Sequence, residues 1–81
     1  MTPKTGYDES LLLQKLRRVA VLGTVTHQQI ADAFWEVAWD LRAAIEQQAP
    51  DKWEEAQERC LQETVPSLVW IVEAAGLEVV P

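Results

Sequence analysis

Hydrophobic positions recur at helical spacing in three segments of the chain. The first segment covers about residues 9–22 and places apolar side chains at i, i+4 and i+7, at Leu12, Leu16 and Val19. Asp8 precedes this segment as an N-cap, and Gly23 follows it as a terminator. The pattern predicts a short amphipathic helix near the N-terminus.

The second segment carries the strongest local signal. Thr26 and Gln29 have the spacing of a capping box, so a helix is expected to begin at residue 27. Val25 before the cap and Ile30 inside the helix add a hydrophobic staple. The apolar stripe that follows is spaced by threes and fours and consists of Ile30, Phe34, Val37, Leu41, Ala44 and Ile45. Because the residue before Pro50 is disfavoured in α geometry, we expect one helix of about 22 residues.

The third segment covers residues 52–75. Asp51 and Glu54 repeat the capping pattern at its start. Pro66 lies in its interior, where a proline removes one hydrogen bond and clashes with the preceding turn. Two outcomes are open, namely one kinked helix or a break before Pro66 followed by a short helix that Gly76 ends. We favour the kinked helix.

Few residues link the second and third helices, which predicts a long antiparallel helical hairpin. Residues 1–7 have no periodicity and are expected to form a flexible arm, and residues 77–81 are expected to pack as an extended end. The prediction is therefore an all-α fold, with a short N-terminal helix and a hairpin in a single domain over residues 8–81.

The two long helices carry more apolar surface than the hairpin can cover. Trp35 and Trp39 form a pair at i,i+4 that is displaced from the main stripe, and the run around Trp70 is apolar on all sides. The first helix could cover both surfaces. We favour a contact with a protein partner or a second copy, and an isologous homodimer that forms a helical bundle is the expected arrangement.

Three acidic residues, Asp32, Glu36 and Asp40, repeat at i, i+4 and i+8. Like charges at this spacing destabilise an isolated helix by a few tenths of a kcal/mol per pair. One interpretation is a solvated face that nearby arginines partly neutralise. The other is an electrostatic contact for a basic partner, in which these residues act together with Trp35, Trp39 and Trp70.

The net charge of −6 disfavours binding to nucleic acid and favours basic partners. Cys60 is the only cysteine, and the N-terminus lacks the pattern of a secretory signal, so a reduced, cytoplasmic protein is expected. No apolar run approaches the roughly 20 residues that cross a bilayer, so no membrane contact is expected.

Catalytic and metal-binding patterns are missing from the sequence. One histidine, His27, and one cysteine cannot provide the spacing of known metal motifs, and no base accompanies Cys60 as a nucleophile would require. We therefore expect neither an enzyme nor a bound cofactor.

Residues 26–34, Thr-His-Gln-Gln-Ile-Ala-Asp-Ala-Phe, resemble the second helix of helix-turn-helix domains. This resemblance implies a DNA-binding regulator, which would use Lys15, Arg17 and Arg18 as well. A third hypothesis is a helical bundle that binds a small ligand between its helices. The leading hypothesis is a small regulatory or adaptor protein that binds another protein. Its size and acidity resemble those of small inhibitors or antiactivators of bacteria and their mobile elements.

Overall fold

The computed structural model describes residues 8–81, and the predicted flexible arm lies outside this range. The chain is mostly helical, which confirms the predicted class in its main feature. The helical segments are α1 (Glu9–Val19), α2 (His27–Val37), α3 (Trp39–Gln48), the 3-10 turn η1 (Pro50–Lys52), α4 (Trp53–Arg59), the π-helical turn η2 (Cys60–Thr64) and α5 (Val65–Ala74). Two short strands, β1 (Thr24–Thr26) and β2 (Glu78–Val80), complete the order.

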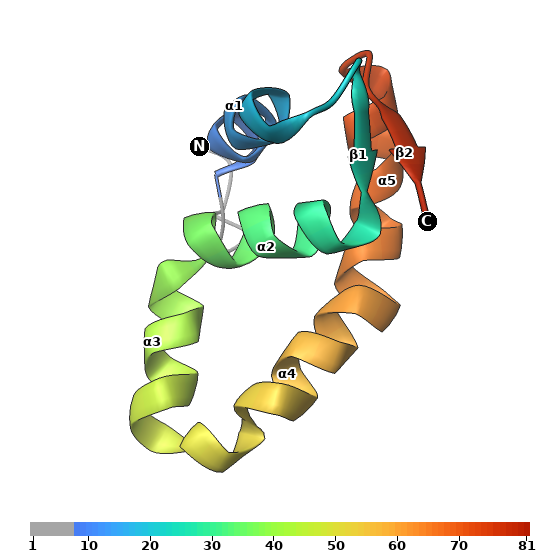
Figure 1. The fold of residues 1–81 in the computed structure, drawn as a ribbon. Coiled ribbons are helices and arrows are strands. Elements are labelled where there is room, and N and C mark those ends of the chain that lie inside the picture. The colour runs from blue at the N-terminus through green and yellow to red at the C-terminus, as the bar shows by residue number, and fades with distance from the viewer. Residues whose placement is uncertain (1–7) are drawn as a thin grey trace.

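Helix α2 lies at the centre of the arrangement. Helix α1 packs against one side of α2, and η2 and α5 pack against another. Figure 1 shows that α3 leaves the end of α2 at a sharp angle, and that the chain returns through α4 toward α5. One cluster of buried side chains joins these elements, and its fully buried members include Leu12, Leu16, Val25, Ile30, Val65 and Val72.

The predicted helix of about 22 residues is wrong, because the chain breaks at Ala38. This residue has φ −99° and ψ 39°, outside helical geometry, and it is buried. The segment contains neither glycine nor proline there, so local propensity gives no reason to stop. Helix α2 buries five residues in the core, whereas α3 buries none. The apolar side of α2 thus lies in the core, whereas beyond the break α3 reaches the core only through partly buried side chains such as Ile45.

The predicted antiparallel hairpin is not observed in the described residues. Its two arms would have been one helix before Pro50 and one after it, but the first arm is divided at Ala38. The main packing of the core runs between α1, α2, η2 and α5, and α3 contacts mainly η1. Asp51 does not cap α4, whose N-cap position is Lys52 without a side-chain hydrogen bond. Dimerisation is left as a proposal.

The all-α prediction also missed a small parallel sheet. Strand β1 pairs with β2 in the register Thr24 with Glu78, Val25 with Val79, and Thr26 with Val80. The strands lie side by side next to α5 in Figure 1. Each has only three residues, below the length at which alternation can be recognised, and about fifty residues separate them. The predicted extended tail is therefore a paired strand.

A tight turn connects α1 to β1. The backbone groups of Val21 and Thr24 exchange two hydrogen bonds of 3.0 Å across it. Leu22 and Gly23 between them have φ values of 53° and 77°, the signs that both central residues of a type I′ turn require. Leucine is an unusual residue at this position because its Cβ is crowded in the left-handed region. Helix α1 itself ends at Val19, earlier than predicted.

The chain continues helically through Pro66, so the kinked helix is observed and the break before Pro66 is not. The π-helical turn η2 lies directly before it, and the Val65 N–H bonds to the carbonyl of Cys60, five residues back. Prolines and π-turns are the usual causes of helix kinks. Figure 1 shows the change of direction between α4 and α5. Gly76, with φ 92°, ends this helix as expected.

Candidate functional site

The four tryptophans differ in exposure, and Trp53 is half-buried against the core. Trp35 is buried, with 7% of its surface exposed, and its ring packs edge-to-face against Phe34 at 5.3 Å and Trp53 at 4.8 Å between centroids. Trp39 and Trp70 are 63% and 68% exposed. The sequence grouped Trp35 with Trp39 as one pair, but the break at Ala38 separates them. Trp35 belongs to the core, and the other two are open to contact.

The predicted acidic stripe does not form one line. Asp32 and Glu36 lie on α2, whereas Asp40 lies on α3 beyond the break. Asp32 accepts a hydrogen bond of 2.9 Å from the Gln28 side chain, and Glu36 lies 4.0 Å from the ammonium of Lys15 on α1. The break at Ala38 therefore takes Asp40 out of the continuous i,i+4 series that the sequence predicted.

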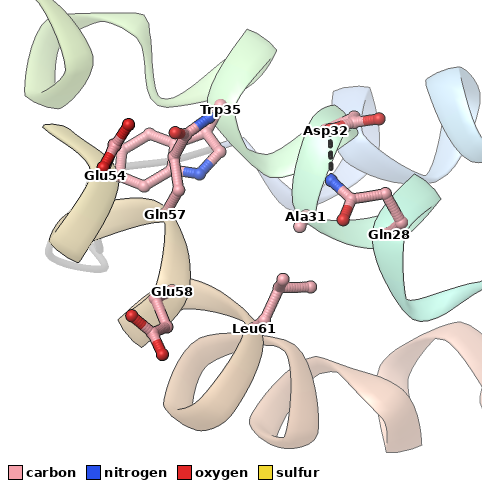
Figure 2. Close-up of a pocket in the computed structure, with 8 residues that line it drawn as sticks. All are labelled: Gln28, Ala31, Asp32, Trp35, Glu54, Gln57, Glu58 and Leu61. Atoms are coloured by element: carbon pink, nitrogen blue, oxygen red, sulfur yellow. Dashed lines mark hydrogen bonds between the residues drawn. The ribbon is translucent and has the colours of Figure 1, made fainter.

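A pocket of about 360 Å³ lies between α2 and α4. It is lined by Gln28, Ala31, Asp32 and Trp35 from α2, by Glu54, Gln57 and Glu58 from α4, and by Leu61 from η2. Figure 2 shows these side chains around the hollow, with the carboxylates at its edges. We call it the acidic pocket, because its lining within residues 8–81 contains three carboxylates and no lysine or arginine. Sequence reasoning identified Asp32 and Trp35 but missed the residues of α4.

Trp35 lines the acidic pocket. Its indole nitrogen, Nε1, is buried and has no hydrogen-bond partner among residues 8–81. Figure 2 shows this nitrogen on the edge of the ring that faces the hollow. A buried donor without an acceptor destabilises the native state by about 1–3 kcal/mol. No other buried side-chain polar atom in residues 8–81 lacks a partner, which makes this position distinct.

A second pocket, of about 240 Å³, lies between α3, α4 and η2. Its lining is mixed and includes Phe34, Trp35, Leu41, Ile45, Cys60 and Arg59. Trp35 is common to both pockets. On α4, the first pocket is lined by Glu54, Gln57 and Glu58 and the second by Ala56 and Arg59, so at helical spacing the pockets lie on different sides of that helix.

The single cysteine does not resemble a reactive thiol. Cys60 is buried, and desolvation raises its pKa to about 11, partly offset by a hydrogen bond with Thr64. A thiol with a raised pKa is a poor nucleophile at neutral pH. Within residues 8–81, no three histidine, cysteine or carboxylate side chains are grouped as metal ligands would be.

The position of a recognition helix in the helix-turn-helix resemblance corresponds to α3. This helix contains Asp40 and Glu46 beside Arg42, and the last two form an ion pair of 2.8 Å. It therefore has a net negative charge and no free cation to contact a phosphate.

None of the helices in residues 8–81 combines the length and apolarity required to cross a bilayer. Comparisons of the chain with protein-family models, curated proteins and solved structures found no significant match.

Proposed function

We propose that the protein is a small regulatory or adaptor protein of the inhibitor or antiactivator type, which acts by binding another protein. The exposure of Trp39 and Trp70 is the observation that carries this proposal. Tryptophan is usually buried because of its large apolar area, and it is enriched among the residues that dominate binding energy at interfaces. Two indoles that are about two-thirds exposed are unusual in a chain of 81 residues.

Charge supports a basic partner. The chain carries a net charge of −6, and Asp32, Glu54 and Glu58 all line the acidic pocket, whose lining among the described residues includes no lysine or arginine. Complementary charge accelerates association and selects among partners. The proposal includes a cytoplasmic location, which fractionation of the native host would test.

Site-specific photo-crosslinking in the native host tests the proposal. A photoreactive amino acid would replace Trp39 or Trp70, and exposed Gln14 on α1 and Gln48 on α3 would serve as control positions. We expect one discrete protein adduct from position 39 or 70 and none from the controls. Equal crosslinking from all four positions, or none from positions 39 and 70, would contradict the proposal.

We also propose that the protein forms a homodimer through these exposed indoles. Trp39 at the start of α3 and Trp70 on α5 are both exposed, so each offers apolar area for a second copy. Sedimentation velocity would measure the oligomeric state at micromolar concentration, with Trp39→Ser and Trp70→Ser as variants. We expect a dimer that at least one variant converts to a monomer. A wild-type protein that is monomeric at all concentrations would refute the homodimer. It would not affect the proposal that the protein binds another protein, which the crosslinking experiment tests.

The two other hypotheses have less support. DNA binding predicts salt-dependent duplex binding through Lys15, Arg17 and Arg18, and the absence of a mobility shift at low salt would eliminate it. A small-ligand binder would use one of the two pockets. The absence of any stabilising compound in a thermal-shift screen would count against that hypothesis.

A further inference from the structure

We infer that the acidic pocket receives the side chain of an arginine from a basic segment of the partner protein, an inference that rests on the proposed function. The inference depends on two independent features of the pocket. One is its set of three carboxylates, and the other is the buried and unpartnered indole N–H of Trp35.

The carboxylates of the pocket are available to a cation. The ion pairs among residues 8–81 use Glu36, Glu46, Glu55 and Glu63. By contrast, Asp32 is bonded to a neutral amide of Gln28, and Glu58 accepts a long hydrogen bond of 3.5 Å from Gln62. Glu54 has neither kind of partner among residues 8–81. A planar guanidinium with several N–H donors suits such a group of acceptors better than a single ammonium.

The indole N–H requires an acceptor oxygen, which a guanidinium does not provide. A peptide does provide one, because each residue carries a backbone carbonyl next to its side chain. Trp35 Nε1 is inaccessible as the structure stands, so a bound segment must displace a neighbouring side chain. Gln57 lines the pocket, is exposed, and is long enough to rotate away.

The size and apolar parts of the pocket agree with one long side chain. Its volume of about 360 Å³ lies at the lower end of the range of about 300–1,000 Å³ for ligand pockets. Ala31 and Leu61 supply apolar wall for the aliphatic stem of an arginine. One arginine residue of the partner therefore supplies all three groups that the pocket suits: a cationic head, an apolar stem and a backbone carbonyl.

The test is an NMR titration that observes the indole N–H signals. The protein would be titrated with the blocked peptide acetyl-Gly-Arg-Gly-amide, with the same peptide containing neutral citrulline, and with free arginine. The signal of Trp35 is assigned by its loss in Trp35→Phe, or by elimination with phenylalanine variants of the other three tryptophans. We expect the arginine peptide to produce a saturable downfield shift of the Trp35 signal, and the citrulline peptide to produce none.

Charge variants locate the binding site. Glu54→Gln and Glu58→Gln should each weaken binding of the arginine peptide about fivefold, as expected for a partly exposed ion pair. Glu55→Gln is the matched control, because it makes the same charge change on α4 at a residue outside the pocket that pairs with Lys52. Its affinity should equal that of the wild type.

Several outcomes would overturn the inference. These are equal shifts with the citrulline peptide, equal weakening by the control variant, or tighter binding of free arginine, which would indicate a small-molecule site. An unchanged Trp35 signal with the arginine peptide would also overturn it. If these results occurred while crosslinking from positions 39 and 70 persisted, the inference about the pocket would fail and the proposed function would stand.

Discussion

Leu22 is held in a backbone conformation that leucine rarely adopts, and its replacement by asparagine should stabilise the protein. The residue has φ 53° in the turn between α1 and β1, and its side chain is 99% exposed. The left-handed region costs an L-residue with a Cβ about 1–2 kcal/mol, and asparagine tolerates it better through local hydrogen bonding. Because the side chain makes no buried contact, the substitution loses no packing.

The expected gain from Leu22→Asn is about 1 kcal/mol in the free energy of unfolding, since asparagine relieves part of the strain. In a domain of this size that gain raises the Tm by about 4–8 °C. Urea unfolding followed by circular dichroism at 222 nm, a standard helix readout, measures the free energy, and a thermal melt measures the Tm. The change places an asparagine directly before Gly23, and asparagine followed by glycine is the preferred pair of a type I′ turn.

Leu22→Ala is the control for this prediction. Alanine also removes the exposed leucine side chain, but it lacks the polar group with which asparagine hydrogen-bonds locally, so the backbone strain stays and the stability should change by less than about 0.5 kcal/mol. Equal stabilities of the asparagine and alanine variants would refute the reasoning. Removal of the exposed leucine side chain would then account for any gain, and relief of backbone strain would not.

Three further predictions concern single side chains. Thr26→Ala should destabilise the protein by about 1 kcal/mol in urea unfolding because it removes the capping hydrogen bond of 3.1 Å from Gln29 N–H, and Thr26→Ser should retain most of the stability. Burial raises the pKa of Cys60 to about 11, so about one thiol in a thousand should be ionised at pH 8. The native protein should therefore react slowly with a thiol reagent and the unfolded protein faster, and rapid reaction of the native protein would contradict the burial of Cys60. Lys15→Met should change the free energy of unfolding by less than about 1 kcal/mol, because its 4.0 Å contact with Glu36 is partly exposed, and a larger loss would show that this pair is more important than its geometry indicates.

Local signals in the sequence predicted the starts of α1 and α2, whereas the similar signal at Asp51 was wrong and the start of α3 gave no signal. Asp8 caps α1 through a 3.1 Å bond to the N–H of Leu11, and Thr26 with Gln29 forms both bonds of the capping box. Such signals involve residues three positions apart, so their geometry is decided by the local sequence alone. The helical class followed from the same kind of short-range periodicity.

Features that depend on distant contacts could not be predicted in this way. The pairing of Val25 with Val79 joins two strands that are about fifty residues apart in the sequence, and the break at Ala38 depends on what α2 packs against. The acidic pocket needs α2 and α4 to be placed beside each other, so Glu54 and Glu58 had no reason to be grouped with Asp32 beforehand. Contacts of this kind override local propensity, and a single sequence does not contain a direct signal for them.

Fluorine NMR of the protein labelled with fluorotryptophan tests the central claim most directly, because it reports separately on each indole. In dilute protein, the resonances of Trp39 and Trp70 should show a solvent isotope shift between H₂O and D₂O, whereas that of Trp35 should not. On association with a second copy or a crosslinked partner, at least one of the two exposed resonances should lose this shift. Full retention of the shift at both positions in the complex would contradict the claim that these indoles form the contact surface.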